Sequence, residues 1–179
     1  MRSVLFIVIG IVSVVAIVAL VGGYFSEQGP MAVPEGGGPA MLAGAPAVSY
    51  PVKRIDGVID SLANYRGRVV LVNLWATWCT PCRQEMPALE TLYERERSHG
   101  LVVLGVDQGE AASVASAFAR RSGVHYPILL DEDQRYGRAY AAIGLPTSLV
   151  VDRSGHIVRG VDGPLTLAQM QDAVEPALR

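Results

Sequence analysis

Apolar residues gather in two runs, 69–74 and 101–106, which are typical of strands buried on both faces of a sheet. Between these runs, apolar positions recur at helical spacing over residues 81–98, and Gly100 follows where such a helix would end. The Asp56-Gly57 pair predicts a hairpin over residues 53–62, because this pair favours tight turns.

Weaker signals complete the predicted domain. Thr166 and Gln169 have the spacing of a capping box, which predicts where the last helix starts. The other predicted elements are helices over residues 113–121 and 134–142, a strand over 128–130, and a hairpin joining 148–152 to 157–159. Strands and helices alternate, so we expect an α/β domain with a central mixed sheet and helices on both faces.

The N-terminal end of the chain has a different character. Residues 4–25 carry no charge and extend for about 33 Å as a helix, against a hydrocarbon thickness of about 30 Å. Residues 22–25 offer only a poor small-residue cleavage site, so residues 1–25 are predicted to be an uncleaved transmembrane anchor, with a cleavable signal peptide as the alternative. Residues 26–46, rich in Gly, Pro and Ala, are predicted to be a flexible tether, and residues 47–179 the folded domain.

Charge indicates the orientation and narrows the partners. Arg2 precedes the anchor, whereas residues 24–52 contain no Lys or Arg, so the positive-inside rule predicts an inner-membrane protein whose domain faces the periplasm. The formal net charge is -2 and there is no basic run, which makes nucleic acid an improbable partner.

Both cysteines of the chain, Cys79 and Cys82, follow the first apolar run directly and open the predicted helix. A sulfur at a helix N-terminus is stabilised as the thiolate by the macrodipole, which makes Cys79 the predicted nucleophile. Cys82 lies one turn further along, on the same helix face, and is placed to resolve a mixed disulfide. The predicted chemistry is therefore thiol-disulfide exchange, with the Cys79–Cys82 disulfide as the redox centre and no separate cofactor.

Other uses of this cysteine pair are weaker. A structural zinc site needs four ligands, and the three histidines are scattered and are predicted to be surface or turn residues. A purely structural disulfide over so short a loop would constrain the unfolded chain little. A Cu(I)-binding chaperone and a disulfide oxidase running the exchange backwards stay open as alternatives.

The run from Val72 to Pro87, with Trp75-Ala76-Thr77-Trp78-Cys79-Thr80-Pro81-Cys82 at its centre, resembles the membrane-anchored TlpA, ResA and CcmG (DsbE) branch of the thioredoxin fold. The resemblance implies an extracytoplasmic thiol-disulfide oxidoreductase that reduces client proteins, such as an apocytochrome c or a copper-site protein. It also implies a membrane electron donor of the DsbD or CcdA type that reduces the cysteine pair again.

The same resemblance implies roles for residues outside the cysteine pair. Pro146 matches the cis-proline of the family and Trp78 the residue that shapes the substrate groove. Glu110 matches a glutamate that the ResA-like branch places in the segment after the next strand. We predict that Glu110 is the acid or base for Cys82, with its pKa raised by partial burial, and a solvated glutamate at a helix start is the alternative. Asn73 replaces the buried acid of ordinary thioredoxins and so cannot accept that proton. The remaining expected substrate contacts are Thr80, Pro81, Leu145 and Thr147.

Overall fold

The structure is a computed structural model that describes residues 38–179. Within that part of the chain, seven strands form one sheet in the order β2-β1-β5-β4-β3-β6-β7. The strands are β1 (Val52–Arg54), β2 (Ile59–Asp60), β3 (Val69–Trp75), β4 (Leu101–Gln108), β5 (Ile128–Asp131), β6 (Thr147–Val151) and β7 (Ile157–Asp162). The three central strands β3, β4 and β5 pair in parallel and the outer pairs are antiparallel, which confirms the predicted mixed sheet.

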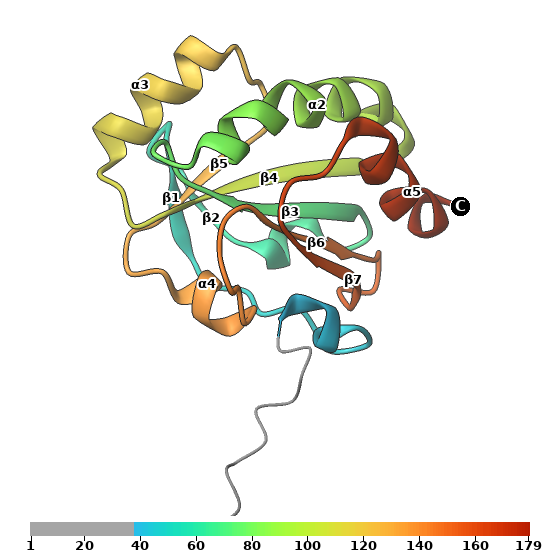
Figure 1. Cartoon of the computed structure of the whole chain (residues 1–179). Coiled ribbons are helices and arrows are strands. Elements are labelled where there is room, and N and C mark those ends of the chain that lie inside the picture. Colours follow the sequence, from blue (N-terminus) through green and yellow to red (C-terminus); the bar gives the residue numbers. More distant parts are fainter. Residues whose placement is uncertain (1–37) are drawn as a thin grey trace, which may run out of the picture. The chain divides into compact units, whose positions relative to one another are not determined.

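Helices cover both faces of this sheet, as predicted. The helices are α2 (Thr80–Glu96), α3 (Ala112–Ser122), α4 (Arg135–Ala139) and α5 (Leu167–Leu178), with short 3-10 turns η1 (Pro39–Leu42), η2 (Leu62–Tyr65) and η3 (Arg97–His99). Figure 1 shows α2, α3 and α5 on one face and α4 with η1 on the other.

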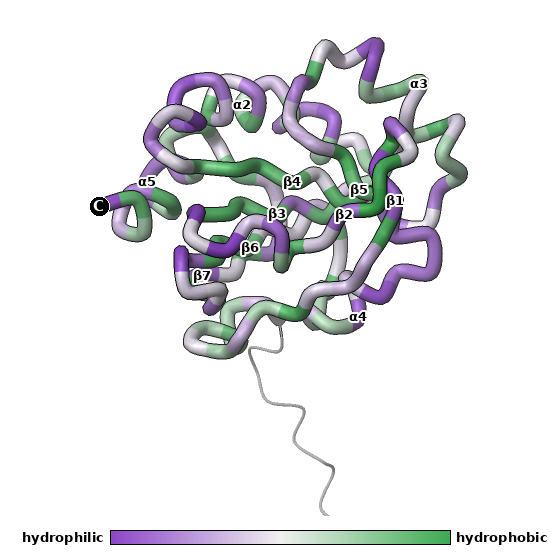
Figure 2. Tube along the Cα trace, turned by 180° about the vertical axis from the view of Figure 1, so that it is seen from behind, coloured by the Kyte–Doolittle hydropathy of each residue, from purple (hydrophilic) through white to green (hydrophobic). Residues whose placement is uncertain are grey.

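The apolar runs form strands because both faces of the sheet are covered. Along β3, Val69 and Leu71 join the core beneath α2 and α5, whereas Val70 and Val72 join the core beneath α4. Figure 2 shows the resulting concentration of hydrophobic residues along β3 and β4. This packing places the carboxyl end of β3 at the start of α2, where the cysteine motif lies.

The caps and turns confirm most predicted boundaries. The capping box of Thr166 and Gln169 is present at the start of α5. Gly100, which follows α2 and η3, and Gly123, which follows α3, have left-handed backbones with φ of 97° and 67°. The β1–β2 hairpin around Asp56-Gly57 is also present.

The helix predicted over residues 134–142 is shorter in the structure, where α4 ends at Ala139. Tyr140 turns inward, is fully buried, and donates its hydroxyl to the Val48 carbonyl oxygen at 2.9 Å. Ala141 then takes a left-handed φ of 50°, which ends the helix. A tertiary contact therefore overrides the local helical pattern.

The packed domain begins earlier than the sequence indicated. Residues 38–46, which the sequence predicts to be part of the tether, lie against β7, where Gly44 and Ala45 exchange backbone hydrogen bonds with Ile157 at 2.7 and 2.9 Å. The Pro39 carbonyl approaches Gly160 so closely that a side chain there would overlap it. Backbone hydrogen bonds attach residues 38–46 to the domain, and such bonds leave no hydrophobic pattern in the sequence from which the packing could be predicted.

No helix within residues 38–179 is long and apolar enough to span a membrane. The predicted anchor, residues 1–25, and the first part of the predicted tether lie outside the described residues.

Candidate active site

Cys79 and Cys82 lie at the junction between the end of β3 and the start of α2, and they form a disulfide with an S–S distance of 2.02 Å. Cys79 is the N-cap of α2, and its Sγ accepts a hydrogen bond from the Cys82 backbone N–H at 3.2 Å. Its side chain is 4% exposed, whereas Cys82 is fully buried. The helix N-terminus and this N–H donor both stabilise negative charge on the Cys79 sulfur, which is the property that a nucleophilic thiolate needs.

The Leu145–Pro146 peptide bond is cis in the structure, in the loop that leads into β6. Trp78 and Leu145 line one surface pocket together with Ala142 and Gly144, and Trp78 is 67% exposed. The fold therefore brings two of the predicted substrate contacts, which are 67 positions apart in the chain (145 minus 78), to one surface beside the cysteines.

The other predicted contacts divide by exposure. Thr80 is exposed and Pro81 is half-buried on the first turn of α2. The Thr147 side chain, by contrast, is fully buried, and its hydroxyl donates to Asp162 Oδ1 at 2.6 Å. Thr147 as a whole is 0% exposed and lies between β3 and β7, so it is closed to a substrate contact, which corrects the expectation for this residue.

Glu110 lies beside the cysteine corner and is held there by Thr77. Its two carboxylate oxygens accept hydrogen bonds from the Thr77 backbone N–H at 2.5 Å and from the Thr77 hydroxyl at 2.6 Å. Among the residues that the structure describes, no hydrogen bond joins Glu110 to Cys82. Proton exchange between Glu110 and Cys82 therefore stays a prediction.

Asp107, at the end of β4, is a site residue that the sequence did not reveal. Its side chain is fully buried, and its Oδ1 accepts a hydrogen bond from the Glu110 backbone N–H at 3.1 Å. Its Oδ2 has no hydrogen-bond partner within the described part of the chain. Burial is the larger cause and the neighbouring Glu110 carboxyl the smaller one of a rise in the pKa of Asp107 to about 8. The available signal was a carboxylate closing an otherwise apolar strand.

A second buried acid, Glu85, lies one helical turn after Cys82. Its Oε1 accepts from the Asn73 amide at 2.7 Å and its Oε2 from the Leu165 backbone N–H at 3.0 Å. Its side chain is 4% exposed, and burial raises its pKa. Asn73 thus acts as a donor that holds an acid on the neighbouring helix. The i,i+3 spacing from Cys82 was the signal for this position.

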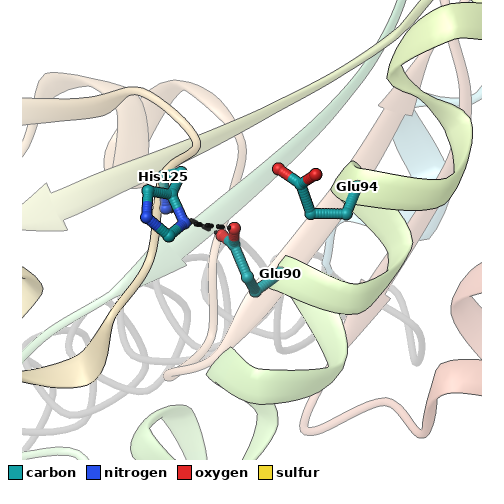
Figure 3. Close-up of side chains that lie close together, drawn as sticks. All are labelled: Glu90, Glu94 and His125. Atoms are coloured by element: carbon teal, nitrogen blue, oxygen red, sulfur yellow. Dashed lines mark hydrogen bonds and ion pairs between the residues drawn. The ribbon is translucent and has the colours of Figure 1, made fainter.

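One histidine has partners that its sequence position did not suggest. Figure 3 shows His125, from the loop before β5, beside Glu90 and Glu94 of α2. Glu90 accepts from both the ring nitrogen and the backbone N–H of His125, each at 2.8 Å. The His125 side chain is 75% exposed, in agreement with the expected surface position. The Glu90 carboxylate is already occupied by these bonds, which join the loop to the helix.

Comparison with known proteins agrees with this geometry. A family model described as the AhpC/TSA family matches residues 43–159. The thiol-disulfide oxidoreductase ResA of Geobacillus thermodenitrificans is 32% identical over 136 residues, covering 76% of this chain and 78% of ResA. The chain belongs to the TlpA/ResA/CcmG family of thiol-disulfide oxidoreductases.

Two further relatives extend the match. ResA of Bacillus subtilis is 31% identical and the alignment covers 72% of each chain. A crystal structure of a thioredoxin-family thiol:disulfide interchange protein from Chlorobium tepidum has a TM-score of 0.68 and 30% identity, and the match covers 75% of this chain and 96% of that protein. As a family member, the chain is a thiol-disulfide oxidoreductase with a thioredoxin-like fold, and Cys79 and Cys82 are its Cys-x-x-Cys pair.

Proposed function

We propose that this protein works outside the cytoplasm as a reductant of client disulfides. The Cys79 thiolate attacks one sulfur of a client disulfide, so that a mixed disulfide forms and one client thiolate leaves. The Cys82 thiolate then attacks the Cys79 sulfur and releases the second client thiolate. The client gains two electrons and takes up two protons, and the Cys79–Cys82 disulfide of the structure is the oxidised product.

The arrangement of carboxyl groups around the cysteine corner carries the proposed direction. Two acids pack close to it, namely Glu85 under the first turns of α2 and Glu110 on Thr77. Negative charge near the sulfurs opposes thiolate formation and so counteracts the helix N-terminus. An oxidant owes its strength to a stabilised reduced form, so a site that stabilises the thiolate less favours the disulfide and acts as a reductant.

The proposed clients and donor come from the family resemblance. Reduction of the cysteine pair of an apocytochrome c, or of a copper-site protein or its chaperone, suits an exposed Trp78 beside a cis-proline loop, because an extended client segment can lie across both. A membrane protein of the DsbD or CcdA type would supply electrons. The proposed anchor and tether, with the domain on the periplasmic side of the inner membrane, would keep the site near such a donor.

The reduction potential of the full chain in a mild detergent tests this direction. The protein is equilibrated in dithiol-disulfide buffers, and the emission of Trp78, next to Cys79, reports the fraction reduced. We expect a value near or below about -270 mV, the potential of thioredoxin. A value near about -120 mV would identify an oxidant instead. Tight stoichiometric binding of Cu(I) by the reduced protein would favour the chaperone alternative.

A further inference from the structure

The corner between β3 and α2, residues 76–79, is held in place mainly by hydrogen bonds to side chains that lie outside it. Its one internal backbone hydrogen bond joins the Cys79 N–H to the Ala76 carbonyl oxygen at 3.2 Å. Every polar group of Thr77, by contrast, binds a neighbouring side chain. Glu110 accepts from its N–H and hydroxyl, and Arg83 donates to its carbonyl oxygen at 3.2 Å. The contacts of Thr77 therefore determine where Trp78 and Cys79 point.

Asp107 stands behind this contact and completes a chain of hydrogen bonds from the sheet to the corner. It pairs with Trp75 in the register of β4 with β3, so it lies at the point where β3 ends and the corner begins. It binds the Glu110 backbone, and Glu110 binds Thr77. A buried carboxyl oxygen without a partner is costly in a structural role alone, because a desolvated acceptor loses its bonds to water.

We propose that Asp107 and Glu110 are a pair of positioning residues that share one proton, and that this proton keeps the Thr77–Cys79 corner in its reactive position. With Asp107 neutral, its hydroxyl has the Glu110 carboxylate as a neighbouring acceptor, and Glu110 keeps both bonds to Thr77. When the proton is lost, two negative charges face each other in a buried setting. Repulsion then moves Glu110, the more exposed partner, away from Thr77, and the corner loosens.

The charges around the pair set the pH at which this happens. Burial opposes the ionisation of Asp107 most strongly. Two neighbouring carboxyl groups add to this effect, Glu110 in the loop after β4 and Asp131 at the end of β5. Asp131 is itself held by hydrogen bonds from the Arg135 N–H, the Tyr136 N–H and the Gln108 side-chain amide, and so keeps its place. Because these effects raise the pKa of Asp107 to about 8, the corner is expected to loosen as the pH rises through that value.

The emission of Trp78 in the oxidised full-length protein tests this inference. The cysteines do not titrate in the disulfide form, so a pH transition in this state cannot come from a thiol. We expect a transition near pH 8 in the wild-type protein and its loss in Asp107→Asn, whose amide imitates the protonated acid. A Trp78→Phe control identifies the reporter. An unchanged transition in Asp107→Asn, or no transition in the wild type, would overturn the inference.

A second variant keeps the test decisive if Asp107→Asn does not fold. Thr77→Val leaves both acids in place but removes one of the two bonds from Thr77 to Glu110. Its transition should stay near the same pH with a smaller amplitude, and full amplitude would contradict the coupling. The inference rests on the proposed function only in taking Cys79 as the nucleophile. A protein that fails to reduce disulfides yet shows the transition would refute the proposed function and leave the positioning pair intact.

Discussion

Replacement of Trp78 by alanine should impair the reaction with protein clients far more than the reaction with small disulfides. Trp78 stands next to Cys79, is 67% exposed, and lines a pocket with Leu145. An exposed indole beside a nucleophile has no folding role for its outer surface. We therefore expect that surface to be covered when a client polypeptide docks.

The size of the effect follows from the exposed area. A tryptophan side chain buries up to about 250 Å², so two thirds of it corresponds to roughly 160 Å². If a client covers half of that area, about 80 Å² is removed from water, which is worth about 2 kcal/mol at about 25 cal/mol per Å². We thus expect kcat/KM for a protein client to fall by roughly 30-fold. The third that is already buried limits the loss of folding stability to about 2 kcal/mol.

The assay compares Trp78→Ala with the wild-type protein on two substrates, a disulfide-containing protein and oxidised glutathione. The glutathione rate should change by less than about 3-fold, because a small disulfide covers little of the indole. Val58→Ala is the matched control, since Val58 is 54% exposed on the β1–β2 hairpin at the far edge of the sheet. Equal losses on both substrates would refute the reasoning, since they would indicate a damaged cysteine corner.

Three further outcomes are expected. Cys82→Ser should accumulate a mixed disulfide with the client, visible on a non-reducing gel, and its absence would contradict a resolving role for Cys82. Gly160→Ala should displace η1, because the new methyl group overlaps the Pro39 backbone. We expect the free energy of unfolding in denaturant to fall by about 1–3 kcal/mol and residues 38–46 to become accessible to protease. Gly144→Ala is the control, since its methyl group meets no atom within 4 Å and should cause none of these changes. Glu85→Gln should change the pH dependence of stability. Burial raises the pKa of Glu85, so above its ordinary 4.5 the wild-type folded state must ionise a buried carboxyl and loses stability relative to the variant. If the free energies of unfolding in urea change equally in both proteins from pH 4 to 7, this prediction is wrong.

The parts of the fold that the sequence predicted depend on local signals. Continuous apolar runs became the central strands, and the capping box at Thr166 became the start of α5. The Cys-x-x-Cys pair likewise appeared at a helix N-terminus, because the strand before it and the helix after it are both readable within a few residues. Side-chain and backbone signals at short range were sufficient for these features.

The partners of the site could not be predicted, because they meet over long distances in the chain. Glu110 binds Thr77 across 33 positions and Glu85 binds Leu165 across 80. No periodic pattern records such pairs, and Asp107 in particular reads as the polar end of a strand until its neighbours are known. The resemblance selected Glu110 as an acid near the site, but the residue that binds it, Thr77, came only from the structure.

This division between local and distant residues bears on how one motif can serve opposite reactions. The helix N-terminus and the Cys82 N–H stabilise a Cys79 thiolate in any protein that has this motif. The acids that oppose the thiolate come from the loop after β4 and from the second turn of α2, outside the Trp-Cys-x-x-Cys run. The redox direction is therefore a property of the packing around the corner. Substitutions at Glu110 or Glu85 should shift the reduction potential upward while the two cysteines and the residues between them stay unchanged.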